Sequence, residues 1–202
     1  MQKRRDTEAR GSTGRRYGAG AVPWAVALFL TTALLPAACA PSSSTADEAA
    51  RREAEVVARS LMAAFETADT SLVQELFWPQ ATYDDFPNQH TYQGIGEIVG
   101  YVTGVHDWAD GVLMNVGAVH TTSDGAVVEW LFSAVQTRPM GRQLTVGTGN
   151  EVVLNGVTVL ELDGGRIVRA ADYTDTGAMM LQLGGRIEMP DGTTIELESI
   201  GN

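Results

Sequence analysis

An aspartate near the end of the last long predicted strand is the first candidate for chemistry. Residues Arg166–Thr174 follow the tight turn Asp163-Gly164-Gly165, whose glycines can adopt positive φ, and are therefore predicted to form the second strand of a hairpin. On this strand Val168, Ala170 and Asp172 share one face. A carboxylate at the end of an apolar strand face is costly to bury unless it is used or hydrogen-bonded, so Asp172 is a candidate acid or base. The alternative is that Asp172 anchors a loop.

The elements that would position this aspartate are helices first and long strands afterwards. Apolar residues recur at three- and four-residue steps, or alternate, in segments bounded by capping and turn residues. The predicted helices are Ala46–Ala68, Leu72–Phe77, Gly94–Val105 and a short one between Asp175 and Gly184. The predicted strands are Ala81–Pro87, Gly111–Thr121, Gly125–Gln136, Glu151–Leu162, Arg166–Thr174 and a hairpin in Arg186–Leu197. This order predicts an α+β fold, with N-terminal helices packed over the concave face of a curved, mostly antiparallel sheet that encloses a pocket for an apolar ligand.

The other reactive residue types are scattered. His90, His106 and His120 show no spacing typical of metal ligands, so we expect no metal site and no cofactor. His106 and Trp108 lie at the end of a predicted helix, where both are candidate ligand contacts at the rim of the pocket; the alternative for His106 is a structural role. The lone Cys39 precedes the domain, and no Gly-x-Ser-x-Gly motif occurs, which argues against a nucleophilic triad.

Two stretches resemble a known family. The sequence GRIVRAADYTD followed by QLG is similar to the closing hairpin of the SnoaL-like polyketide cyclases and limonene-epoxide hydrolases, and ATYDDFP followed by TYQG is similar to their Tyr-x-Asn-x-Pro strand and the Tyr-Gly segment after it. The resemblance covers roughly Val56 to Gly184. It implies the cone-shaped α+β fold of the NTF2-like superfamily.

The resemblance also implies roles for three residues. In the hydrolases a Tyr, an Asn and the final-strand Asp hold the water that opens the epoxide; by position these correspond to Tyr83, Asp85 and Asp172, with Asp85 replacing the amide. In the cyclases an aspartate acts as acid and base on an enolisable polyketide. If Asp85 and Asp172 converge in an apolar pocket, one carboxyl pKa should rise, and Tyr83 could donate a hydrogen bond to a developing oxyanion.

The middle strand Val127–Val135 departs from the hydrolase pattern, which has Arg-x-Asp there. One register places Ser133 in the pocket together with Glu129, which makes Glu129 a second candidate acid. A shift of one residue places Trp130 and Phe132 there instead. Neither register restores Arg-x-Asp. If Glu129 lies outside, it is on the outer sheet face, which the resemblance implies as a surface for a homodimer.

The N-terminus predicts export. Basic residues precede an apolar run, Ala21–Ala38, that ends in small residues before Cys39, so we interpret residues 1–38 as a lipoprotein-type signal peptide, 39–47 as a linker and 48–202 as the domain. Lipidation of Cys39 would place the protein on the outer face of a bacterial cell membrane. Cleavage after Ala38 or Ala40, giving a secreted protein, and an uncleaved membrane anchor are the alternatives.

The charge changes with this processing. The chain of 202 residues has 14 basic and 25 acidic residues and a net charge of −11. Residues 1–38 contain six of the basic and two of the acidic residues, so the remainder keeps 8 basic residues, all arginine, against 23 acidic ones, a net charge of −15. Such a surface argues against nucleic acid and against anionic lipid headgroups as partners.

Three hypotheses follow from these observations. The first is a membrane-tethered domain that binds a small apolar or polyketide-like molecule and carries out cofactor-free cyclase or isomerase chemistry with Asp172. The second is a ligand-binding or accessory module on the same fold without turnover. The third is an epoxide hydrolase in which Glu129 supplies the missing acid.

Overall fold

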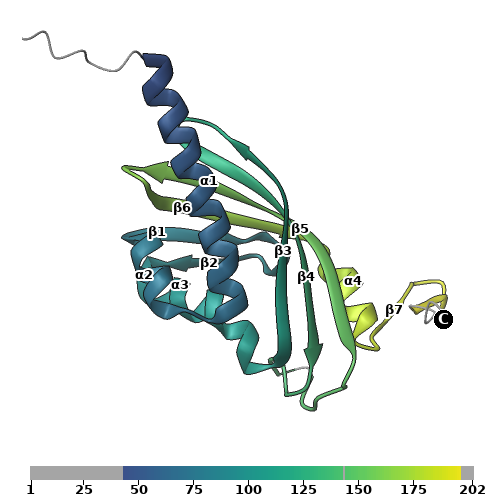
Figure 1. Ribbon diagram of the computed structural model, residues 1–202. Helices are drawn as coiled ribbons and strands as arrows, with labels where there is room; N and C mark the ends of the chain where they lie inside the picture. The colour runs from purple at the N-terminus through teal and green to yellow at the C-terminus, as the bar shows by residue number, and fades with distance from the viewer. Residues whose placement is uncertain (1–42, 143, 197–202) are drawn as a thin grey trace, which may run out of the picture. The chain divides into compact units, whose positions relative to one another are not determined.

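A six-stranded curved sheet is the main element of the protein. The computed structural model describes residues 43–142 and 144–196 (Figure 1). The sheet has the order β2-β1-β6-β5-β4-β3. Its strands are β1 Phe77–Asp85, β2 His90–Gln93, β3 Ala109–Thr121, β4 Gly125–Gln136, β5 Glu151–Asp163 and β6 Arg166–Thr174. All neighbouring pairs are antiparallel except β1 and β6, which run parallel. The predicted α+β class with a mostly antiparallel sheet is confirmed.

The N-terminal helices gather against one face of this sheet (Figure 1). They are α1 Ser43–Thr67, α2 Thr70–Leu76 and α3 Gly94–Thr103, and the short 3-10 turns are η1 Phe86–Asn88 and η2 Gly104–Asp107. Helix α1 contacts β3 and β4, whereas α3 contacts β1. The side chain of Asp69 caps α2 by accepting hydrogen bonds from the amides of Ser71 and Leu72.

The core lies between these helices and the sheet. Helix α1 contributes Ala54, Ala58 and Leu61, which are fully buried, and the sheet contributes residues such as Val128 and Ile167. Fully burying one such aliphatic side chain stabilises the fold by roughly 1.5–3 kcal/mol before conformational entropy is counted. The apolar stripe of α1 therefore fixes the helix across β3 and β4, which leaves the space above β1, β6 and β5 to be closed by α3 and the loops.

After β6 the chain forms α4 Thr176–Gln182 and a small hairpin of β7 Arg186–Glu188 and β8 Thr194–Glu196. The carboxylate of Asp175 accepts a hydrogen bond from the amide of Ala178 and caps α4, and Gly184 follows the helix with φ +87°. The predicted short helix and the final hairpin are both present. Across residues 43–142 and 144–196, no helix is both long and apolar enough to cross a membrane.

The largest differences from the sequence prediction lie at β1 and β2. Strand β1 begins at Phe77, which was expected to end a helix, and the segment His90–Gln93, expected to be a loop, forms β2. The reason is tertiary: Tyr83, Asp84 and Asp85 pair with residues of β2 on one side and of β6 on the other. The predicted signal peptide, the lipidation site Cys39 and residues 39–42 of the predicted linker lie outside the described residues. Residues 43–47, also predicted as linker, form the start of α1 instead.

Candidate active site

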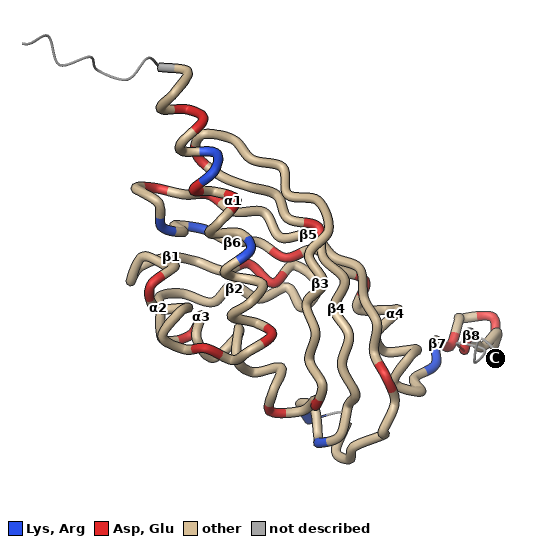
Figure 2. Tube along the Cα trace, in the orientation of Figure 1, with Lys and Arg blue, Asp and Glu red and all other residues tan. Residues whose placement is uncertain are grey.

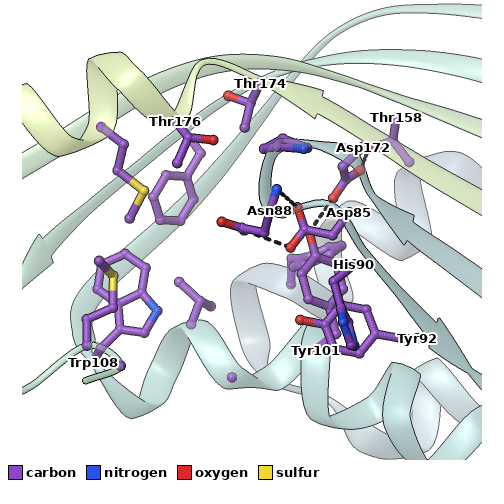
Figure 3. Close-up of a pocket in the computed structure, with 18 of the residues that line it drawn as sticks. Asp85, Asn88, His90, Tyr92, Tyr101, Trp108, Thr158, Asp172, Thr174 and Thr176 are labelled. Carbon is purple, nitrogen blue, oxygen red and sulfur yellow. Dashed lines mark hydrogen bonds between the residues drawn. The ribbon is translucent and has the colours of Figure 1, made fainter. Parts of the chain in front are cut away.

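A cavity of about 890 Å³ lies between the inner face of the sheet and the helices (Figure 3). All six strands of the sheet, the helices α1, α3 and α4, and the turns and loops between them contribute to its wall. About half of the lining residues are aromatic or methionine: Phe65, His90, Tyr92, Tyr101, Trp108, Trp130, Phe132, Met114, Met140, Met179 and Met180. The acidic side chains in the wall are Asp85, Glu97 and Asp172. A pocket of this size and composition suits a small, largely apolar molecule with a few polar contacts.

Asp172 is held at the sheet side of this cavity by three hydroxyl groups. Its Oδ1 accepts hydrogen bonds from the hydroxyl of Tyr83 at 2.8 Å and the hydroxyl of Thr158 at 2.5 Å. Its Oδ2 accepts one from the hydroxyl of Tyr101, also at 2.8 Å. A carboxylate has about four lone-pair sites, so Oδ1 is fully occupied and Oδ2 keeps one site open. The side chain is thus fixed in orientation with one oxygen available.

Burial dominates the electrostatics of this carboxyl group. Asp172 is only 6% exposed. Burial raises the pKa of Asp172 from its ordinary value near 3.8 to about 6; the hydrogen bonds from Thr158, Tyr83 and Tyr101 oppose the rise, and the negative charge of Asp85 adds to it. At pH 7 the group is therefore mostly ionised while its pKa lies close to neutrality, which is the condition that favours a general base.

The two tyrosines remain donors throughout the ordinary pH range. Burial, and next to it the charge of Asp172, raises the pKa of Tyr83 and of Tyr101 well above the usual value of 10. They differ in position, because Tyr101 lines the cavity whereas Tyr83 is fully buried behind it. Tyr83 therefore orients Asp172, and Tyr101 can contact both Asp172 and a bound molecule.

Thr158 is oriented by a further hydrogen bond. Its hydroxyl accepts from the indole Nε1 of Trp130 at 2.8 Å and therefore directs its own proton to Asp172. The indole ring lies against the backbone of Gly156, where an added Cβ would overlap the ring atoms. Glycine at 156 thus makes room for the tryptophan that fixes the donor of the carboxylate.

Asp85 lies beside Asp172 in the parallel pairing of β1 and β6 (Figure 3). It is 2% exposed, and its hydrogen-bond donors are the backbone amide of Asn88 at 3.3 Å and the side-chain amide of Asn88 at 2.8 Å. These bonds close the η1 turn. The cavity therefore contains two adjacent buried carboxyl groups whose partners are hydroxyl and amide groups, without a cationic side chain.

The arginines of β6, Arg166 and Arg169, form their contacts away from the two buried carboxyl groups. Arg169, three residues before Asp172, forms ion pairs with Asp84 at 2.7 Å and with Glu161 at 2.9 Å on the other face of the sheet. Arg166 donates to the backbone carbonyls of Gln74 and Phe77 and lies over the ring of Trp78. No cluster of three or more His, Cys, Asp or Glu side chains within the described ranges could hold a metal ion.

The structure separates the candidates of the middle strand. Trp130 and Phe132 line the cavity, so the strand takes the register shifted by one residue. The expectation that Glu129 and Ser133 lie inside is wrong, because side chains alternate along a strand and both belong to the opposite face. There Glu129 is more than half exposed and lies 3.7 Å from His120.

The two residues predicted at the rim of the pocket, Trp108 and His106, occupy different positions. Trp108 lines the cavity and its ring lies 6.3 Å from that of Phe132. His106, predicted as a ligand contact, is not part of the cavity wall; its Nε2 is 2.9 Å from the backbone carbonyl oxygen of Phe65, so it joins η2 to α1. This placement corresponds to the structural alternative for His106.

Sequence reasoning missed Tyr101, Thr158, Asn88 and Thr176. Tyr101 is a lone aromatic on a glycine-rich helix, and its partner lies 71 positions further along the chain. Thr158 shares a strand face with Leu160, so alternation placed it in the core without indicating a role. Thr176 lines the cavity, and its buried hydroxyl has no hydrogen-bond partner among the described residues.

Comparison with known families agrees with this fold and cavity. Residues 58–170, more than half of the chain, match the family model of the SnoaL-like domain. The chain belongs to the SnoaL-like family. The family predicted from the closing hairpin and the Tyr83 strand is thus confirmed, and the fold is that of the NTF2-like superfamily. No curated protein matches the chain significantly.

Solved structures share the fold of this SnoaL-like domain at low sequence identity. A candidate SnoaL-like polyketide cyclase from Jannaschia sp. CCS1 superposes with a TM-score of 0.60 and 18% identity, over 66% of this chain and 92% of that one. A protein with a ketosteroid isomerase-like fold from Catenulispora acidiphila gives 0.56 and 18%, over 64% and 92%. An epoxide hydrolase of the limonene-epoxide hydrolase type from M. tuberculosis gives 0.53 and 16%, over 66% and 90%.

Proposed function

We propose that the SnoaL-like domain binds a small molecule with an apolar body in its cavity and catalyses a cofactor-free proton transfer of the cyclase or isomerase type, with Asp172 as the general base. The observation that carries this proposal is the state of Asp172. It is a buried carboxyl group in an aromatic cavity, and burial raises its pKa to about 6. Its three partners are hydroxyl groups rather than a cation.

The hydrogen-bond pattern suggests which atom reacts. Oδ1 of Asp172 is saturated by Tyr83 and Thr158, whereas Oδ2 accepts from Tyr101 alone. We assign Oδ2 as the oxygen that takes a proton from the substrate. Tyr101 lies beside this oxygen and lines the cavity, so it is placed to donate to an oxygen on the substrate as negative charge develops there.

Two further groups fit a ligand of this kind. The hydroxyl of Thr176 is buried at the cavity wall with no described partner, and a polar group on the ligand would satisfy it. Asp85 lies beside Asp172, and its carboxylate raises the pKa of Asp172 and so strengthens it as a base.

Epoxide hydrolysis with Glu129 as the acid is less well supported. That mechanism needs an acid on the cavity side of β4, and Glu129 belongs to the opposite face of this strand. The residues that β4 presents to the cavity are Trp130 and Phe132, neither of which can protonate an epoxide oxygen.

The proposal can be tested without knowing the substrate. The compound 5-nitrobenzisoxazole reacts with a base that removes the proton on C3 while the ring N–O bond breaks, which gives a coloured nitrophenolate carrying a nitrile. A carboxylate base in an apolar pocket accelerates this reaction. We expect catalysis whose rate rises through about pH 6 and then levels off, and a loss of about 100-fold or more in Asp172→Asn.

Two variants make the test specific. Glu129→Gln removes a carboxylate from the outer face and should leave the rate unchanged. Tyr101→Phe removes a hydrogen bond that lowers the pKa of Asp172, so the pH profile should shift upward. If Asp172→Asn keeps the wild-type rate while remaining folded, the domain is a binding module and Asp172 is not its base.

The location of the protein is a second proposal and rests on the sequence alone. We propose that residues 1–38 direct export and that lipidation of Cys39 anchors the domain to the outer face of a bacterial membrane. The residues between Cys39 and the start of α1 at Ser43 would connect the anchor to the domain. Cys39→Ser should move the protein from the membrane fraction to the soluble exported fraction. Unchanged fractionation would exclude the lipid anchor.

A further inference from the structure

The charges around the cavity are all of one sign, apart from a single histidine. Three acidic side chains line it, namely Asp85, Glu97 and Asp172, and the first and last of these are almost completely buried. The domain from residue 48 onward has only eight basic residues, all arginines, and each of them belongs to the described part of the chain. None of the eight lines the cavity. Figure 2 shows in blue where the arginines of the described residues lie along the chain.

His90 is the one group in the described wall that could carry a positive charge. It is exposed at the rim, and its ring packs edge-on against Tyr92 at 4.5 Å between centroids. It forms no ion pair with Asp85 or Asp172 among the described contacts. The carboxylates of the cavity therefore face a molecule entering from solvent without an internal counter-ion.

The aromatic side chains of the wall add to the negative electrostatic potential of the cavity. The rings of Tyr92 and Tyr101 are stacked at 4.5 Å, directly below the two aspartates (Figure 3). Trp108, Trp130 and Phe132 also belong to the wall. The face of an aromatic ring carries negative charge density, so it attracts cations and repels anions, as the carboxylates do.

We propose that the ligand of this cavity is an organic cation, either a protonated amine or a quaternary ammonium group, with an apolar body. The cationic centre lies between Asp85, Asp172 and the rings of Tyr92 and Tyr101, and the apolar body occupies the aromatic and methionine wall. This assignment deepens the proposed proton transfer and rests on it for the role of Asp172, since a cation at this place keeps the carboxylate in its ionised, basic form. A neutral apolar ligand would leave the two buried carboxyl groups without a counter-ion.

The proposal is tested by three probes of the same shape and different charge, none of which reacts with a base. They are benzyltrimethylammonium, its neutral carbon isostere 2,2-dimethylpropylbenzene, and the anion phenylmethanesulfonate. Trp108 and Trp130 line the cavity and report binding through their fluorescence. We expect the cation to bind at least about tenfold more tightly than the neutral isostere, and the anion not to bind.

Matched variants locate the selectivity. Asp85→Asn and Glu129→Gln each remove one negative charge, but only Asp85 lies in the cavity. We expect Asp85→Asn to weaken binding of the cation about tenfold without weakening the neutral probe, and Glu129→Gln to change neither. Tyr92→Leu should weaken the cation several-fold, whereas Tyr92→Phe, which keeps the ring, should not.

Several results would overturn this assignment. They are a neutral probe or an anion that binds as tightly as the cation, equal losses in Asp85→Asn and Glu129→Gln, or equal losses in Tyr92→Leu and Tyr92→Phe. These outcomes are independent of turnover. Selective cation binding with no effect of Asp172→Asn on proton transfer would retain a cation site and reject the catalytic role, and the reverse would retain the base and reject the cation.

Discussion

The two faces of the strand pair β1 and β6 differ in how their acidic side chains are partnered. Asp84 and Asp85 are neighbours on β1, so their side chains point to opposite sides of the sheet. Outside, Asp84 forms an ion pair with Arg169, which also binds Glu161. Inside, Asp85 and Asp172 lie side by side with hydroxyl and amide donors as partners. The same two strands therefore carry a compensated, partly solvated charge cluster outside and an uncompensated, buried one inside.

This difference indicates where the protein gives up stability for function. An ion pair near the surface contributes about 0–1 kcal/mol and is screened by salt. A buried carboxylate without a cation lowers stability unless it is protonated. The neighbouring Arg169 could have neutralised the inner pair had it stood one position away, on the other face of β6. The inner arrangement thus lowers the stability of the unliganded protein, and a ligand that supplies a positive charge would reduce this loss.

The largest expected effect on stability is at Asp172. Its folded pKa of about 6 lies above the ordinary value near 3.8. The stability that the protonated Asp172 contributes is therefore fully present below about pH 4. As the pH rises through 6, the free energy of unfolding should fall by about 3 kcal/mol in total. Asp172→Asn cannot ionise. Its free energy of unfolding, measured in urea, should equal that of the wild type near pH 4 and exceed it by up to about 3 kcal/mol near pH 7.5.

The outer face provides the control for this measurement. Glu129→Gln removes a carboxylate whose side chain is 56% exposed. We expect its free energy of unfolding to stay within about 0.5 kcal/mol of the wild type. A difference between Asp172→Asn and wild type that does not grow with pH would contradict the contrast between the two faces.

The second effect concerns a donor to the inner carboxylate. Thr158→Val keeps the shape of a fully buried side chain but removes the hydroxyl that links Trp130 to Asp172. The indole N–H then lacks its partner, and Asp172 loses a hydrogen bond that lowers its pKa. We expect a loss of about 1–3 kcal/mol in the free energy of unfolding and an upward shift of the pH profile of proton transfer.

Thr91→Val is the matched change outside. The hydroxyl of Thr91 donates to Asp84 at 2.7 Å, in an exposed position where water can replace it. Its loss should change the unfolding free energy by no more than about 0.5 kcal/mol. Equal losses in the two variants would mean that the inner network is no more tightly coupled than the outer one.

These examples also show how far the sequence determines the site. Alternation along Arg166–Thr174 was sufficient to place Asp172 on an apolar face, and cap and turn residues placed α2, α4 and the hairpin between β5 and β6. The register of β4 could not be decided, because Trp130 and Phe132 on one face and Leu131 on the other are all apolar. Only pairing with β3 and β5 decides it.

Two of the three donors to the inner carboxylate, Tyr101 and Thr158, could not be predicted from the sequence for a related reason. Tyr101 reaches Asp172 from α3, and Trp130 reaches it through Thr158 from two further strands. These contacts are set by how α3 lies over β1 and by the space that Gly156 leaves for the indole ring. Neither the position of α3 over β1 nor the space beside Gly156 can be recognised from a local sequence pattern. The NTF2-like resemblance identified Asp172 together with Tyr83 and Asp85, which the structure does bring together, but not Tyr101 or Thr158.

The smallest expected effect lies in the outer cluster. Asp84→Asn removes the ion pair with Arg169, whose side chain is 31% exposed and keeps Glu161 as a second partner. We expect a loss of at most about 1 kcal/mol in 0.05 M NaCl, and a smaller loss in 1 M NaCl because salt screens the pair. Urea unfolding at the two salt concentrations measures it. A loss above about 3 kcal/mol that salt does not reduce would mean that the carboxylate of Asp84 is desolvated. The distinction between the two faces of β1 would then fail, because both Asp84 and Asp85 would be shielded from solvent.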